Sequence, residues 1–87
     1  MASYKLVVKK SVAKDLRPVP NKEVIRILQC MEGLRENPRP VGCEKLSGQE
    51  RYRLRHGRYR IIYEIADEQL LVTVVKIGHR KHVYKSG

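Results

Sequence analysis

The chain has 87 residues, which suits one domain spanning residues 1–87 and is too short for two. It carries 19 Lys and Arg against 9 Asp and Glu, so its formal net charge is +10. Such a basic balance favours a polyanionic partner, such as nucleic acid, an anionic membrane surface or an acidic protein. No segment approaches the roughly 18 apolar residues of a membrane span. The N-terminus lacks the apolar stretch of a signal peptide, and the two cysteines have no metal-ligand spacing, so we expect a cytoplasmic protein.

The first part of the chain predicts one strand and two helices. Residues 4–8 are β-prone, and Ser11 is a suitable N-cap for a short helix. Prolines at 18 and 20 end that helix. Asn21 is a suitable N-cap for a longer helix that ends near Glu36, before Asn37-Pro38. Apolar residues recur at helical spacing along this second helix and predict its core face: Val24, Ile27, Leu28, Met31 and Leu34.

The second part predicts a sheet. Residues 37–48 form a loop, and three β-prone segments follow at 51–55, 59–65 and 70–77, with links short enough for hairpins. The last segment is continuously apolar, which is typical of a central strand. We therefore predict an α+β fold in the order β-α-α-β-β-β. An antiparallel sheet would be covered on one side by a helical hairpin.

Residues 51–60 read RYRLRHGRYR, with five arginines and no acidic residue. Strand alternation puts Arg51, Arg53 and Arg55 on one face, and the hairpin returns Arg58 and Arg60 toward them. Adjacent like charges repel one another, so this concentration makes sense where an anion fills the gap and each guanidinium grips phosphate oxygens. The alternative is an exposed, well-solvated face. The interleaved tyrosines could stack on bases or pack in the core.

A second basic segment, KIGHRKHVYK at 76–85, leaves the apolar strand at Gly78. It carries His79, Arg80, Lys81 and Tyr84. Taken alone, His79 would be a surface histidine and Tyr84 would pack at the sheet edge. Beside two arginine-bearing strands, these residue types predict a functional site.

The chain resembles a known toxin family in four segments that occur in a specific order. These are the NPR sequence after the second helix, KLSG at 45–48, YRLRHGRYRIIYEI at 52–65 and VVKIGHRKHVY at 74–84. In them it is similar to the RelE toxins of the RelE/ParE superfamily, which belong to bacterial toxin–antitoxin pairs. The RelE branch cleaves messenger RNA in the ribosomal A site. The resemblance covers nearly the whole chain.

The resemblance implies a set of site residues. Arg60 and Arg80 match the family's arginines that would hold the scissile phosphate, and Tyr84 matches its C-terminal catalytic tyrosine. Arg53 and Arg55 match two basic strand residues that are often lysines in the family. Four neighbours are expected to contact RNA: Arg51, Arg58, His79 and Lys81. Because arginine stays charged, this chain would rely on electrostatic stabilisation, and His79 is the candidate for proton transfer.

The residues themselves are compatible with this chemistry. RNA is cut when its 2′-hydroxyl attacks the adjacent phosphate, which requires a base and groups that neutralise the pentacoordinate intermediate. The sequence shows no carboxylate pair and no metal-binding cluster, so we expect no cofactor and no metal ion. Tyr84 is the predicted base, because nearby arginines favour the phenolate and lower a phenol's pKa.

Two other functions share these features. A ParE-like toxin would have the same fold but would inhibit DNA gyrase. A non-enzymatic RNA-binding module would use the arginines only to hold phosphates. The resemblance also implies partners, namely the ribosome with its messenger RNA and a cognate antitoxin in a hetero-oligomer. The charge of +10 independently favours an acidic antitoxin segment that covers the basic surface.

Overall fold

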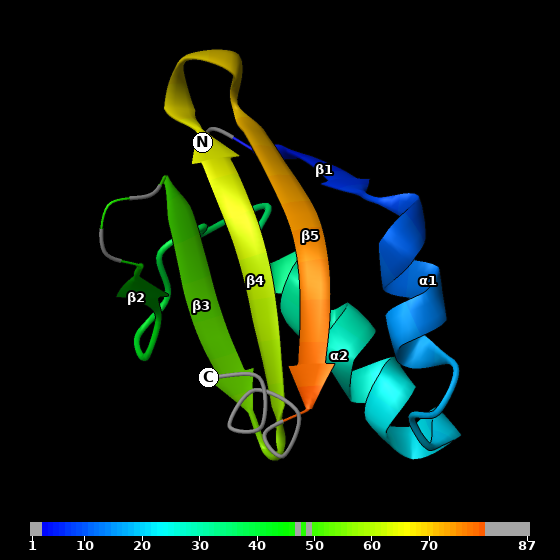
Figure 1. The fold of residues 1–87 in the computed structure, drawn as a ribbon. Coiled ribbons are helices and arrows are strands. Elements are labelled where there is room, and N and C mark those ends of the chain that lie inside the picture. The colour runs from blue at the N-terminus through cyan, green and yellow to red at the C-terminus, as the bar shows by residue number, and fades with distance from the viewer. Residues whose placement is uncertain (1–2, 47, 49, 80–87) are drawn as a thin grey trace.

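A computed structural model describes residues 3–46, 48 and 50–79 of the chain (Figure 1). It confirms the α+β fold and the predicted order of elements. One short strand, β2, is added within the segment that we predicted as a loop. The elements are β1 (Lys5–Val8), α1 (Lys10–Leu16), α2 (Asn21–Gly33), β2 (Glu44–Lys45), β3 (Arg51–His56), β4 (Tyr59–Ala66), the 3-10 turn η1 (Asp67–Gln69) and β5 (Leu71–His79).

The sheet has five strands in the order β1-β5-β4-β3-β2. Strand β4 pairs antiparallel with both β3 and β5, as predicted, and the added strand β2 pairs antiparallel with β3. Strand β1 pairs with β5 in parallel, so the sheet is mixed. Short links dictate antiparallel pairing between consecutive strands. No such link joins β1 to β5, which lie at opposite ends of the chain. Sequence patterns therefore carried no signal for their relative direction.

The helices cover one face of the sheet and form the core with it. Ile27 and Met31 of α2 and Val12 of α1 are almost completely buried, and they belong to one cluster with Tyr63 and Val74 of the sheet. The predicted core face of α2 is correct except at Leu28, which is 45% exposed. Both predicted N-caps are displaced, because α1 begins one residue before Ser11 and α2 begins at Asn21 itself.

Strand alternation gives the sheet a second face, turned away from the helices, which we call the open face. Tyr52 lies opposite Tyr63 and Leu54 opposite Ile61 on the helix side of β3 and β4. The residues between them therefore project from the open face. Those on β3 are Arg51, Arg53 and Arg55, and their cross-strand partners on β4 are Glu64, Ile62 and Arg60.

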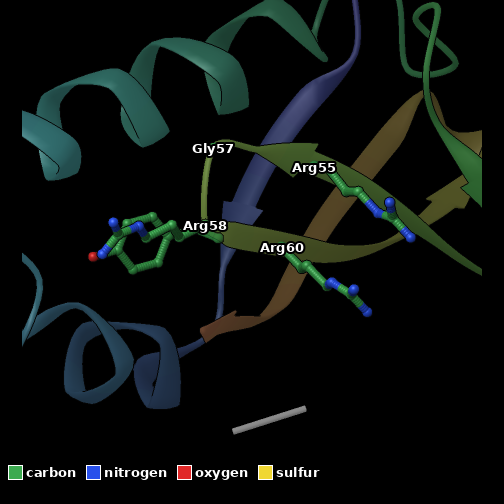
Figure 2. A pocket seen from close by; sticks show the side chains of 5 residues that line it. Arg55, Gly57, Arg58 and Arg60 are labelled. Atoms are coloured by element: carbon green, nitrogen blue, oxygen red, sulfur yellow. The ribbon is translucent and has the colours of Figure 1, made fainter. Parts of the chain in front are cut away.

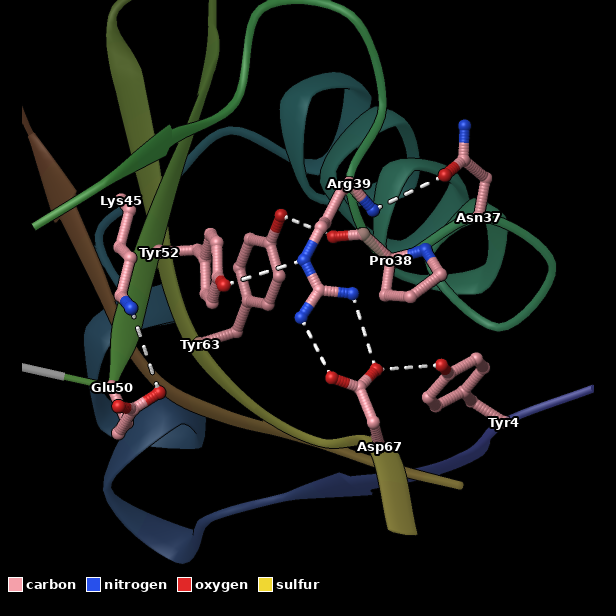
Figure 3. A network of polar contacts seen from close by, with 9 residues as sticks. All are labelled: Tyr4, Asn37, Pro38, Arg39, Lys45, Glu50, Tyr52, Tyr63 and Asp67. Atoms are coloured by element: carbon pink, nitrogen blue, oxygen red, sulfur yellow. Dashed lines mark hydrogen bonds and ion pairs between the residues drawn. The ribbon is translucent and has the colours of Figure 1, made fainter. Parts of the chain in front are cut away.

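A polar network closes the end of the sheet where β4 meets β5 (Figure 3). Arg39 donates to both carboxylate oxygens of Asp67, at 3.1 and 2.8 Å, and its Nε donates to the Tyr52 hydroxyl at 3.3 Å. The Tyr4 hydroxyl donates to Asp67 at 2.8 Å. These contacts tie β1 and the loop after α2 to the turn between β4 and β5. We call this set of four residues the Arg39 network.

Candidate functional site

The turn between β3 and β4 lies at the other end of the sheet, beside the end of β5 (Figure 1). Gly57 has a φ of 58°, which an L side chain rarely adopts, so glycine allows the strands to reverse within two residues. A pocket lies at this turn (Figure 2), and we call this region the hairpin end. Its lining consists of Arg55, Gly57, Arg58, Tyr59 and Arg60.

Two arginines lie directly opposite each other at the hairpin end. Arg55 on β3 pairs in register with Arg60 on β4, and their side chains run in the same direction (Figure 2). Arg55 is exposed, whereas Arg60 is only 6% exposed. Arg58 points away from both. Like charges at directly opposed positions destabilise a sheet, so an anion held between the two guanidinium groups would relieve the repulsion.

The other two arginines of β3 have carboxylate partners from neighbouring strands. Nε of Arg51 lies 3.0 Å from Oε2 of Glu64, and Nη2 of Arg53 lies 2.9 Å from Oε2 of Glu44. The five arginines of residues 51–60 therefore do not form one uncompensated cluster. The segment itself contains no acidic residue, but strand pairing places Glu64 of β4 and Glu44 of β2 beside it.

His79 is separated from the paired arginines by the sheet. It lies opposite Tyr59 on the helix side, and the two rings meet edge to face with centroids 5.2 Å apart. Its neighbour Gly78 lies opposite Arg60 instead. A role for His79 in proton transfer beside Arg60 is therefore not supported by its position in this structure.

The two tyrosines of the arginine-rich segment are core residues. Tyr52 is 8% exposed and its ring stacks on Tyr63 with centroids 5.9 Å apart, and Tyr59 is 9% exposed. Of the two readings that the sequence left open, core packing is the correct one. Neither ring is available on the open face to stack with a base.

Three predicted site residues lie outside the part of the chain that the structure describes. These are Arg80, Lys81 and Tyr84. Strand β5 ends at His79, in register with Tyr59 at the hairpin end. Grouping of Arg60 with Arg80 and Tyr84 therefore remains a prediction.

The structure adds one basic residue that the sequence analysis did not select. Lys76 lies opposite Ile62, so it projects from the open face two cross-strand pairs away from the position of Arg60. It is exposed, although it belongs to the apolar run of β5. Lys76 is the one charged residue within that run, and this was the signal available for it, because a central strand with one open face keeps some outward polar positions.

Among residues 3–46, 48 and 50–79, no three His, Cys, Asp or Glu side chains are placed to hold a metal ion. No helix in the described part of the chain is long and apolar enough to cross a membrane. The expectation of metal-independent chemistry stays a prediction.

Comparisons with known proteins agree on one family. Residues 6–84 match a family model described as the ParE toxin of the type II toxin-antitoxin system parDE. A curated protein of Methanocaldococcus jannaschii, provisionally named toxin RelE1, is 28% identical over 87 residues, covering 95% of this chain and 97% of the relative.

Two solved structures extend the similarity to the fold. One is a chain in the RelE–RelB complex of Pyrococcus horikoshii, with a TM-score of 0.81, 28% identity, and coverage of 90% of this chain and 96% of the other. The second is a chain in the toxin-antitoxin complex RelBE2 of Mycobacterium tuberculosis, with a TM-score of 0.78 and 26% identity. It covers 92% of this chain and 94% of that chain.

Proposed function

The chain belongs to the RelE/ParE toxin family of type II toxin–antitoxin systems, and we propose that it is a ribosome-dependent endoribonuclease. It would cut messenger RNA in the ribosomal A site, without a metal ion, and so inhibit translation. The similar proteins named above carry the name RelE, which favours this branch of the family. The observation that carries the proposal is the opposed pair Arg55 and Arg60 at the hairpin end.

Such a pair suits a phosphodiester. Each guanidinium presents a planar fork of donors that fits two phosphate oxygens, and it remains charged at any physiological pH. Arg60 is nearly buried, so its direction is fixed by its surroundings, whereas Arg55 is exposed and can follow the strand that binds. One rigid and one mobile fork would position a phosphate and neutralise the charge that develops on it.

The proposed reaction uses the RNA's own 2′-hydroxyl. Tyr84 takes the hydroxyl proton, a bond forms from O2′ to phosphorus, and the bond from phosphorus to O5′ breaks. The products are a 2′,3′-cyclic phosphate and a 5′-hydroxyl, and solvent water protonates the leaving O5′. In this proposal Arg60 and Arg80 hold the non-bridging oxygens, and Arg55 stabilises the negative charge of the intermediate.

We propose that an acidic antitoxin binds this chain in a hetero-oligomer. Two of the similar structures are complexes of a RelE protein with its antitoxin. The net charge of +10 would strengthen attachment of an acidic segment and speed its association.

Primer extension on a message translated with and without the protein tests the cleavage. We expect breaks within codons in the presence of ribosomes, and 2′,3′-cyclic phosphate ends. Tyr84→Phe removes the proposed base, and Arg80→Ala removes one phosphate contact, so both variants should lose cleavage and growth arrest. Full toxicity in both variants would contradict the assigned roles.

Inhibition of DNA gyrase is the second candidate, because the matching family model is described as a ParE toxin. A supercoiling assay separates the two functions. Inhibited supercoiling with intact translated messages would favour gyrase. A third outcome, salt-dependent RNA binding without cyclic phosphate products, would indicate a non-enzymatic RNA-binding module.

A further inference from the structure

Charge is distributed unevenly along the open face. In the row farthest from the hairpin end, Arg51 and Glu64 neutralise each other, and in the next row Arg53 is paired with Glu44. In the row at the hairpin end, Arg55 has no carboxylate within ion-pair distance among the residues that the structure describes. Positive charge therefore rises toward the hairpin end.

Arg53 stands at the boundary between the neutral and the positive part. Its side chain is 22% exposed, while that of Glu44 is 56% exposed. The Nε atom of Arg53 is buried and has no hydrogen-bond partner among residues 3–46, 48 and 50–79. An unsatisfied buried donor is unfavourable, so Arg53 retains capacity for another acceptor. The Glu44 carboxylate nevertheless occupies its outer edge.

Glu44 sits on an edge strand of two residues, where it lies opposite Arg53. Its negative charge opposes any phosphate that approaches Arg53, because like charges repel and the guanidinium is already compensated. Alternate residues of a strand are about 7 Å apart, so successive arginines of β3 are far enough apart to serve different phosphates. Without the Glu44 charge, Arg53 would be able to hold a second phosphate next to one bound at Arg55.

We propose that Glu44 limits the length of the RNA-binding surface by keeping Arg53 from contacting RNA. By keeping Arg53 in an ion pair, it confines phosphate contacts to the hairpin end and prevents the RNA backbone from extending along β3. This inference rests on the proposed RNA-binding function and adds to it the extent of the bound strand.

The test compares wild type with Glu44→Gln. The probe is a single-stranded RNA with a 2′-O-methyl group at every nucleotide, which cannot be cleaved, and anisotropy measures its affinity across a salt series. Release of a partly exposed ion pair should tighten binding about two- to fivefold at low salt. One added phosphate contact should steepen the slope of log K against log salt by about 0.7.

Glu50→Gln is the matched control. Glu50 is 85% exposed and lies 3.8 Å from Lys45, so this variant has the same change in net charge without releasing an arginine of the open face. We expect its salt slope to equal that of wild type. Arg53→Gln added to Glu44→Gln should remove the gain, and thermal unfolding verifies that each variant is folded.

The outcomes separate the two proposals. If Glu44→Gln behaves like Glu50→Gln, or if its gain survives Arg53→Gln, the inference about Glu44 is overturned while RNA binding stands. If wild type fails to bind the free RNA at every salt concentration, the inference about Glu44 is overturned, while primer extension on a translated message decides the proposed ribosome-dependent cleavage separately.

Discussion

At one end of the sheet Arg39 is held by a carboxylate and a phenol, whereas at the other end Arg55 lies opposite a second arginine. The Arg39 network contains matched donors and acceptors, and its guanidinium also lies 5.2 Å from the centre of the Tyr52 ring. Every one of its contacts joins segments that are distant in the chain. The hairpin end instead places like charges together. The contacts of the Arg39 network stabilise the fold, whereas the opposed arginines at the hairpin end repel each other, as expected of a site that binds an anion.

The pKa values of two tyrosines bear on the choice of the catalytic base. The hydrogen bond to Asp67 raises the pKa of Tyr4, and burial raises the pKa of Tyr63. A phenol that acts as a base needs the opposite shift, toward neutral pH. These two tyrosines are therefore suited to donate hydrogen bonds, whereas the proposed base, Tyr84, belongs to the basic segment at 76–85.

Substitution of Arg60 should have the largest effect on the cleavage rate, and the same substitution at Arg39, at the other end of the sheet, should leave that rate unchanged. Arg60→Gln removes a nearly buried charge at the proposed phosphate site, and we expect cleavage of a translated message to slow about 100- to 1,000-fold. The matched control is Arg39→Gln, the same substitution in the Arg39 network. It should lower the thermal midpoint but leave cleavage per folded molecule unchanged. A folded Arg60→Gln protein that cuts at the wild-type rate would contradict the proposed site.

Tyr63→Phe should have the next largest effect, on stability alone. The Tyr63 side chain is completely buried, and its hydroxyl donates to the Pro38 carbonyl oxygen at 2.7 Å. Its loss leaves a buried carbonyl without its donor, which costs about 1–3 kcal/mol of the free energy of unfolding. Denaturant titration measures this change. Unchanged stability would show that the hydrogen bond contributes nothing, and a fall in cleavage per folded molecule would link this residue to the site.

The fold was predictable because short-range signals determine most of it. Helical spacing located Ile27, Met31 and Leu34 in the core, and the short link between the segments at 51–55 and 59–65 predicted the β3–β4 hairpin, which the structure closes with residues 57 and 58. The same link sets the register, which pairs position 51 with position 64. The predicted link had three residues, 56–58, and counting outward from it pairs position 51 with position 63, so the Arg51–Glu64 ion pair follows only from the observed turn.

Contacts between distant segments were not predictable in this way. Glu44 reaches Arg53 through a strand of two residues inside a loop, and so short a strand has no recognisable pattern. The position of His79 depends on the pairing of β4 with β5, which includes a register shift between Ile62 and Tyr63. A shift of one residue exchanges the two faces of a strand, so His79 lies on the helix side rather than beside Arg60.

The stabilising role of the Arg39 network should appear as a pH dependence of protein stability, through the ionisation of Asp67. The hydrogen bond from Arg39 lowers the pKa of Asp67 below its ordinary value, and that from Tyr4 adds to the effect. A depressed pKa means that the ionised carboxylate stabilises the folded state. This contribution is complete above the unfolded pKa of about 3.9 and is lost as pH falls through the lower folded pKa.

Asp67→Asn tests this contribution. The difference in thermal midpoint between wild type and Asp67→Asn should be largest near neutral pH and should shrink below about pH 4. It should be smaller than the effect of Tyr63→Phe, because Asp67 is exposed and solvent screens its ion pair. A difference that stays constant between pH 7 and pH 2 would show that the charge of Asp67 is not responsible.

Arg58→Gln should have the smallest effect. It tests whether Arg58 contributes to RNA binding alone, whereas Arg55 and Arg60 also contribute to cleavage. Arg58 lines the same pocket as Arg55 and Arg60 but points away from both, so it adds positive charge near the RNA without gripping the reacting phosphate. We expect affinity for the 2′-O-methyl RNA to fall about two- to fivefold, with a salt slope shallower by at most about 0.7. Cleavage at saturating message should remain at the wild-type rate, because a charge that acts only on binding does not stabilise the transition state preferentially. A reduced maximal rate with unchanged affinity would instead place Arg58 at the reacting phosphate, and the opposed pair would then have to be extended to three arginines.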